Sequence, residues 1–254
     1  MRIAAVGDVH LGMNSAGALR PCVETLPECA DLLLLAGDLT RHGTPEEARV
    51  VAAELVHAPV PVVAVLGNHD YHADRPAEVT AILEEVGVRV LESAATVVDV
   101  GGRRVGVAGT KGFGGGFAGH ALDVFGEPEM KAVALRSAAC AQGLRSALES
   151  LRDAGCESRI ALTHYAPVPD TVAGEPPEIY PFLGSYLLAQ AIDEAGADLA
   201  VHGHAHYGTE HGMTNGGVRV RNVALPLLRQ AFALYNLHEA PPTDPAPIEG
   251  VSSP

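Results

Sequence analysis

The chain has 254 residues, enough for one large domain or two small ones, and its 47% hydrophobic and 19% charged residues exclude disorder throughout. Its 17 Lys and Arg residues against 31 Asp and Glu give a net charge of −14, which disfavours a nucleic-acid polymer or an anionic membrane as partner. Because no apolar run approaches the roughly 20 residues that cross a bilayer, and the N-terminus lacks the apolar core of a signal peptide, we expect a cytoplasmic protein with reduced cysteines.

Short apolar runs alternate with segments of helical periodicity, the pattern of an α/β fold in which helices cover a sheet. Strands are predicted at Arg2–Val6, Leu32–Ala36, Val62–Leu66, Arg104–Ala108, Arg159–Leu162, Leu199–Val201, Val218–Val223 and Phe232–Leu237. Helices are predicted at Thr44–Val56, Pro76–Val86, Pro128–Ala154 and Ser185–Ala195. Thr44 and Glu47 form a capping box at the start of the first helix. Gly155 and Gly196 follow the last two helices as stop signals.

Glycine and proline mark the connections between these elements. Gly101 and Gly102 join two strand-like runs and predict a hairpin, so the sheet system is expected to be mixed. The Gly-rich segment 110–117 lacks the order of a nucleotide-binding P-loop and is expected to be a mobile surface loop. A Pro-rich composition from residue 239 to 254 predicts a disordered tail after a domain that spans residues 1–238.

Five of the predicted strands end directly before residues that commonly bind metal ions. In an open α/β sheet the carboxyl ends of the strands line one rim, so these side chains are expected to converge. Asp8 and His10 are two residues apart, as are His204 and His206, so in extended backbone each pair points to one side. The candidate ligands are Asp8, His10, Asp38, Asn68, His164, His204 and His206.

Imidazole, carboxylate and amide groups make up this set, without a thiolate. They suit Mn, Fe, Co or Zn better than they suit a structural zinc site built from cysteines. Seven ligands exceed what one ion needs, so two divalent ions that share a carboxylate are predicted. His202 lies on the opposite face of its strand from His204 and is expected to pack in the interior, with ligation as the alternative.

The ordered motifs Asp8-x-His10, Gly37-Asp38, Gly67-Asn68-His69-Asp70, His164 and Gly203-His204-x-His206 resemble those of the calcineurin-like metallophosphoesterase superfamily, from residue 2 to about 238. This resemblance implies a four-layer α/β/β/α sandwich of two mixed sheets, with a binuclear metal centre at the rim between them. By motif, it implies that Asp8, His10 and His206 hold one metal, that Asn68, His164 and His204 hold the other, and that Asp38 bridges them. It also implies that His69 protonates the leaving oxygen.

Departures from the family pattern narrow the branch. In the protein-phosphatase branch, Asp and Arg stand three and four residues after the bridging Asp, and Glu follows the motif His. Here the corresponding residues are Arg41, His42 and Asp70, which disfavours a protein phosphatase. Segment 37–47, together with Gly-Asn-His-Asp, is similar to the cyclic-nucleotide and glycerophosphodiester phosphodiesterase branch.

The predicted function is therefore hydrolysis of a small phosphodiester by attack of metal-bound hydroxide. Asn68 and His69 are expected to contact the substrate, as are Arg41 and His42, for which a role in a surface turn is equally open. The Pro-rich segment 166–181 is expected to cover the substrate entrance, since it follows His164 directly. A phosphomonoesterase is the main alternative, and a nuclease or a non-catalytic metal-binding scaffold is less favoured. Oligomeric state is left open.

Overall fold

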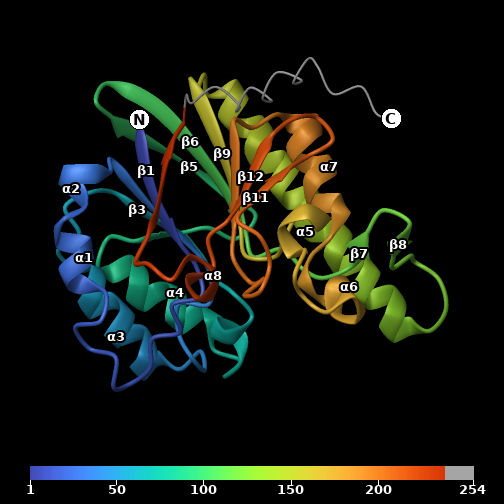
Figure 1. Cartoon of the computed structure of the whole chain (residues 1–254), viewed down its shortest axis with the longest axis horizontal. Helices are drawn as coiled ribbons and strands as arrows, with labels where there is room; N and C mark the ends of the chain where they lie inside the picture. The colour runs from blue at the N-terminus through green and yellow to red at the C-terminus, as the bar shows by residue number, and fades with distance from the viewer. Residues whose placement is uncertain (238–254) are drawn as a thin grey trace, which may run out of the picture.

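Two large sheets stand face to face at the centre of the protein, whose computed structural model describes residues 1–237 (Figure 1). The predicted tail at 239–254 lies outside the described residues. The first sheet has the order β13-β1-β2-β3-β4, and only β13 is antiparallel to its neighbour. Its strands are β1 (Arg2–Val6), β2 (Leu32–Ala36), β3 (Val62–Val65), β4 (Arg89–Val90) and β13 (Ala233–Asn236).

The second sheet has the order β11-β12-β10-β9-β6-β5 and is antiparallel only at its two edges. Both sheets are thus mixed, as predicted. The strands of this sheet are β5 (Ala94–Val100), β6 (Arg103–Thr110), β9 (Ser158–Thr163), β10 (Leu199–His202), β11 (His211–Met213) and β12 (Arg219–Asn222).

Helices cover the outer face of each sheet and complete the predicted four layers (Figure 1). The first sheet carries α1 (Arg20–Glu24), α2 (Leu26–Cys29), α3 (Pro45–Leu55) and α4 (Pro76–Glu85). The second carries α5 (Pro128–Asp153) and α7 (Tyr186–Ala195). Within residues 1–237, no helix combines the length and the hydropathy that a membrane span requires.

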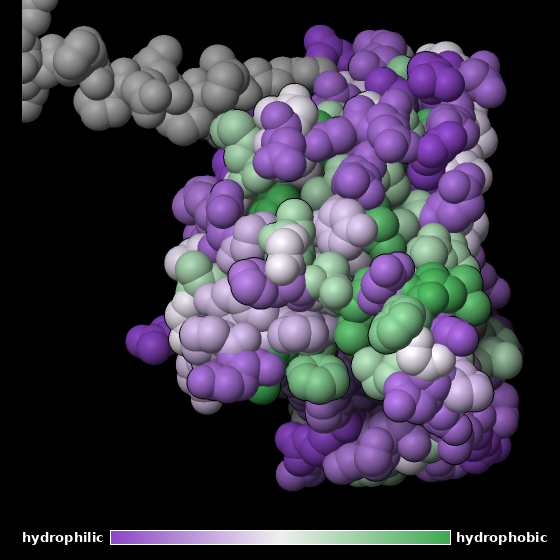
Figure 2. Space-filling model, turned by 90° about the vertical axis from the view of Figure 1, so that its right-hand side faces the viewer, coloured by the Kyte–Doolittle hydropathy of each residue, from purple (hydrophilic) through white to green (hydrophobic). Residues whose placement is uncertain are grey.

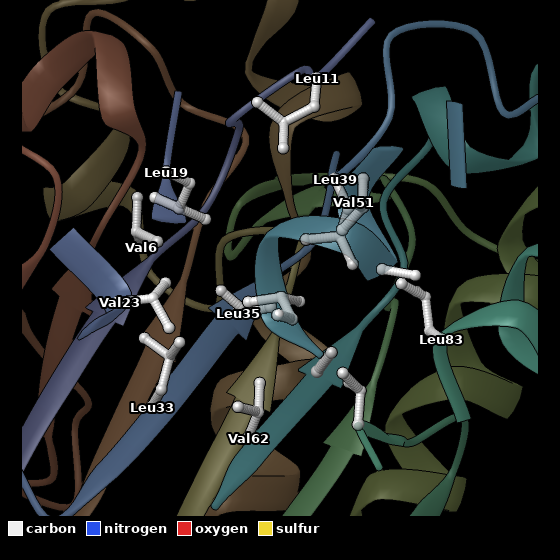
Figure 3. Packing of buried hydrophobic residues seen from close by; sticks show 14 of the residues in the cluster. Val6, Leu11, Leu19, Val23, Leu33, Leu35, Leu39, Val51, Val62 and Leu83 are labelled. Atoms are coloured by element: carbon white, nitrogen blue, oxygen red, sulfur yellow. The ribbon is translucent and has the colours of Figure 1, made fainter. Parts of the chain in front are cut away.

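Alternate residues of the central strands pack into different cores. In β2, Leu33 and Leu35 face α3 and α4, where they meet Val51 and Leu83 (Figure 3). Leu32 and Leu34 instead point between the two sheets, into a cluster that β9 and β10 complete. Because both faces of the strand are buried, the run from Leu32 to Ala36 is apolar at every position, with no polar alternation.

The sequence predicts every long element to within two residues at each end. The Thr44 hydroxyl accepts the N–H of Glu47 at 3.2 Å, which confirms the capping box. Gly101 and Gly102, with φ of 57° and 80°, join β5 to β6 as the predicted hairpin. The short elements escaped prediction: β4, β7 (Gly116–Phe117), β8 (His120–Ala121), β11, α1, α2, α6 (Tyr180–Leu183) and α8 (Leu225–Leu228).

Segment 110–117 corrects one expectation, because it is packed rather than mobile at the surface. Seven of its eight residues are buried. The N–H of Gly115 donates to the carbonyl of Pro181 at 2.7 Å, and a Cβ at Gly114 would lie 2.6 Å from that same oxygen. These glycines therefore permit close contact between backbones, a use that composition alone does not distinguish from flexibility.

Glu54 of α3 ties the loop before α1 to the first sheet's helical layer. Its buried carboxylate accepts the N–H groups of Gly17, Leu19 and Arg20 at 2.7, 2.9 and 2.7 Å. Burial alone would raise the pKa of Glu54, but these N–H groups and the Arg20 charge bring the pKa below its ordinary value.

We expect Glu54→Gln to lower the free energy of unfolding by about 1–3 kcal/mol at pH 7, since two charge-assisted acceptors are lost. Because the pKa is lower in the folded protein, the contribution of Glu54 is present above about pH 4.3 and disappears as the pH falls through the folded-state pKa. Urea unfolding from pH 3 to 7 measures this difference, and Glu24→Gln at an exposed position is the control. A pH-independent difference would contradict the assignment.

Candidate metal centre

The seven candidate ligands converge at the rim where the carboxyl ends of both sheets meet. Asp8, Asp38 and Asn68 follow β1, β2 and β3 of the first sheet, while His164 and the His204 loop follow β9 and β10 of the second. Their ligand atoms form three groups, in each of which all atoms lie within 4.8 Å of one another. The groups are Asp8, His10 and His206; His10, Asp38 and His69; and Asp38, His164 and His204.

The first group surrounds the buried Asp8 carboxylate. His206 Nε2 lies 3.0 Å from Asp8 Oδ1, and the backbone N–H of His204 donates to Asp8 Oδ2 at 2.9 Å. His10 Nε2 lies 3.7 Å from Asp38 Oδ2, which connects this group to the next. Asp8 and His10 therefore face one space, as their spacing in the sequence predicts.

Asp38 is the junction of the other two groups. One carboxylate oxygen, Oδ1, lies 3.4 Å from His164 Nε2 and accepts the N–H of His69 at 2.8 Å. The other oxygen faces His10 and lies 4.0 Å from His69 Nε2. Asn68 Oδ1 lies 2.9 Å from His164 Nε2, and the rings of His164 and His204 are 4.7 Å apart.

Backbone carbonyls orient three of the imidazoles. His164 Nδ1 donates to Ala36 O at 2.8 Å, which leaves the lone pair of Nε2 toward Asp38 and Asn68. His204 Nε2 donates to Phe182 O at 3.2 Å, which leaves Nδ1 as its ligand atom. The sequence could not reveal these carbonyl partners, because they lie far away in the chain.

The backbone at the rim is strained in order to bring the ligands together. Asp8, His10, Asp38 and His204 all adopt a positive φ, of 58°, 43°, 51° and 71°, a conformation that side chains other than glycine rarely take. Such strain persists only where the surrounding structure enforces it, and it concentrates at functional sites. Gly67 is required beside it, since a Cβ there would collide with the Asp38 carboxylate.

Two observations test whether these residues fit a metal ion. Within residues 1–237, His10 Nε2 is the one buried side-chain nitrogen or oxygen without a hydrogen-bond partner. His164 Nε2 and Asn68 Oδ1 face each other as two acceptors, an arrangement that shared coordination of a cation would satisfy. The donor set of imidazole, carboxylate and amide therefore fits divalent ions.

The charges at the rim favour the same conclusion. Burial, followed by the negative charge of Asp8, raises the pKa of Asp38 to about 6. Burial lowers the pKa of His10 and of His164, and it lowers the pKa of His204 to about 3. These imidazoles are therefore neutral at pH 7, the form in which a ring nitrogen can bind a metal ion.

His69 lies beside the groups, with its ring 4.5 Å from that of His10. Its Nδ1 donates to the backbone carbonyl of Arg41 at 2.8 Å, so the side of Arg41 that faces the imidazole is an oxygen rather than the guanidinium. His42 is turned away, because its Nδ1 pairs with the carboxylate of Glu47 at 2.9 Å. Arg41 and His42 are thus adjacent to the rim without joining any ligand group.

Asp70 is a site residue whose role the sequence did not indicate, although it belongs to the Gly-Asn-His-Asp motif. Its buried carboxylate accepts the N–H groups of Leu39, Thr40 and Gly67 and the hydroxyl of Thr40, at 2.6–3.1 Å. It therefore joins the turn after β2 to the turn after β3. Asp70 fixes the backbone on both sides of Asp38.

The Pro-rich segment 166–181 supports the loop that carries His204 and His206. Thr171 Oγ1 lies 2.7 Å from Nε2 of the buried His202, which packs in the interior as predicted, and Glu175 accepts the N–H of Tyr207 at 2.8 Å. On its other side, the segment borders a cavity of about 780 Å³ beside α6 and α7, on the face where hydrophobic side chains gather (Figure 2). Its predicted position over the substrate entrance stays a prediction.

The fold and the donor set are those of a metallophosphoesterase. A family profile described as calcineurin-like phosphoesterase matches residues 1–208, and the chain belongs to this family. Over 80 residues, the chain is 35% identical to a "Probable cyclic nucleotide phosphodiesterase" of Synechococcus sp., a match that covers 28% of this chain and 31% of that relative.

Solved structures share the fold at low sequence identity. Phosphopantetheinyl hydrolase from Mycobacterium tuberculosis superposes with a TM-score of 0.64 and 19% identity, over 89% of this chain and 90% of its own. A protein of Thermus thermophilus superposes with a TM-score of 0.55 and 20% identity, over 93% of this chain and 98% of its own.

Proposed function

We propose that the protein is a binuclear metal-dependent hydrolase of a small phosphodiester. The observation that carries this proposal is the position of Asp38, which belongs to two ligand groups at once. One divalent ion is assigned to Asp8, His10 and His206, the other to Asn68, His164 and His204, with Asp38 shared. When bound, two such ions acidify a water molecule and neutralise charge on the phosphoryl oxygens.

The residues of the chain supply orientation and a proton. Asn68 and His69 contact the phosphate in this proposal, and His69 donates the proton that the leaving oxygen needs. The Arg41 carbonyl holds His69 Nδ1 and so presents Nε2 toward the rim. The Arg41 guanidinium and the exposed His42 ring are proposed as outer contacts to the substrate.

A phosphodiester is preferred over a monoester on two grounds. Segment 37–47 and the Gly-Asn-His-Asp motif are similar to the phosphodiesterase branch of the family, and the curated relative carries a phosphodiesterase name. A net charge of −14 speaks against a nuclease of duplex DNA. A full set of ligands, with neutral imidazoles, speaks against a non-catalytic scaffold.

The proposed activity is tested with purified protein loaded with Mn²⁺. We expect kcat/KM for bis-p-nitrophenyl phosphate to exceed that for p-nitrophenyl phosphate, with 2′,3′- and 3′,5′-cyclic nucleotides as further diesters. EDTA treatment should abolish the activity and Mn²⁺ should restore it. Faster hydrolysis of the monoester would favour a phosphomonoesterase, and no hydrolysis of any ester would exclude both.

Metal content tests the shared position of Asp38. We expect about two metal equivalents per wild-type chain and close to none in Asp38→Ala, because both sites lose a ligand. His206→Ala should lose about one equivalent, since it removes a ligand from one site alone. Elemental analysis measures the content, and circular dichroism checks the fold. Full occupancy in Asp38→Ala contradicts the shared assignment.

The role of His69 is tested by changing the leaving group. General acid catalysis is worth about 10²–10⁴-fold and matters most when the departing oxygen is strongly basic. His69→Ala should therefore slow an alkyl diester such as glycerophosphocholine far more than bis-p-nitrophenyl phosphate, at equal metal content. Equal losses on both substrates would identify His69 as a group that positions phosphate without donating a proton.

A further inference from the structure

Lys111 is a buried ammonium beside the metal centre. The chain contains two lysines: Lys111 directly after β6, and Lys131 on α5. Lys131 is exposed, whereas Lys111 is only 5% exposed. Burial of a charge away from water is unfavourable unless partners compensate it, so the surroundings of Lys111 require an explanation.

Three aromatic rings surround the Lys111 ammonium. Nζ lies 5.1 Å from the centre of the Tyr71 ring, 4.9 Å from that of Phe113 and 5.0 Å from that of Tyr165. Each ring attracts the cation by its quadrupole and also restricts its movement. We call these three rings the aromatic cage. The cage holds the charge in one place.

The ammonium retains hydrogen-bonding capacity inside this cage. Its one protein hydrogen bond is to Gly112 O at 3.3 Å, although an ammonium has three protons to donate. The carboxylate of Glu92 accepts the Thr110 hydroxyl at 3.0 Å and the backbone N–H of Lys111 at 3.1 Å. Among the ion pairs within residues 1–237, none includes the Lys111 ammonium. Burial lowers the pKa of Lys111, which an anion beside it would counteract.

The aromatic cage belongs to the same segments as the metal centre. Tyr71 lies three residues after Asn68, and the Tyr165 ring lies 4.4 Å from the ring of His204. The Lys111 carbonyl accepts the N–H groups of His164 and Tyr165, both at 3.1 Å. The ammonium is therefore fixed on the His164 and His204 side of the rim.

We propose that Lys111 is a substrate-binding residue, whose ammonium donates a hydrogen bond to an anionic oxygen of the phosphate ester held at the rim. This inference rests on the proposed function, because it assumes a phosphate ester as the ligand. A fixed cation with free N–H donors suits an anionic oxygen, and the aromatic cage keeps water from replacing it. Lys111 then adds the positive charge that side chains at this rim otherwise lack.

The first test compares Lys111→Met with Lys131→Met. We expect Lys111→Met to weaken the binding of inorganic phosphate to the Mn²⁺-loaded protein by about 10-fold or more, as measured by isothermal titration calorimetry. The KM for bis-p-nitrophenyl phosphate should rise as well, while metal content and melting temperature stay close to wild type. Lys131→Met should match wild type throughout. Wild-type phosphate affinity in metal-loaded Lys111→Met overturns the proposal.

A second test uses the wild-type protein and does not depend on the folding of a variant. Acetic anhydride acetylates both lysines, and mass spectrometry quantifies each modified peptide. Inorganic phosphate should slow acetylation of Lys111 in the Mn²⁺-loaded protein and leave Lys131 unchanged. Equal acetylation with and without phosphate overturns the proposal. If the protein hydrolyses no ester yet phosphate still protects Lys111, the proposed function fails and the anion site stands.

Discussion

Two carboxylates, Asp8 and Asp38, are buried within one rim, and their need for positive charge governs the local structure. Burial and the charge of Asp8 raise the pKa of Asp38, while the imidazoles around it are held neutral by their own burial. Neutral imidazoles contribute lone pairs instead of charge. The rim therefore concentrates ligands and leaves the compensation of charge to bound cations.

The layered fold exists around this rim and explains how the ligands reach it. The strands end together because β1, β2 and β3 are parallel in one sheet and β9 and β10 are parallel in the other. The cluster between the sheets keeps both sets of strand ends at one height. Beyond the strands, Asp70 holds two turns in register through four hydrogen bonds, so the strained backbone at Asp38 has no freedom to relax.

Much of this arrangement is predictable from the sequence, because the long strands and helices carry strong periodicity and capping signals, as at Thr44 and Gly196. The candidate ligands are predictable because each follows an apolar strand. What the sequence does not contain is the partner of each imidazole: the carbonyls of Ala36, Phe182 and Arg41 are anonymous in sequence and distant along the chain. The packing of segment 110–117 is hidden for the same reason, since glycine marks close contact as well as flexibility.

The acidic composition and an anionic substrate are compatible once distance is considered. Charges beyond about 8–10 Å are largely screened at physiological ionic strength, so the net charge of −14 acts weakly at a recessed rim. Close to the rim, the fixed Lys111 ammonium and the proposed divalent ions set the local field. A small ester can enter that field and leave the rest of the surface behind. A polymeric polyanion would extend across the acidic surface, and its repulsion there would oppose the local attraction. The same charge distribution that permits a small phosphate ester therefore selects against a long nucleic acid.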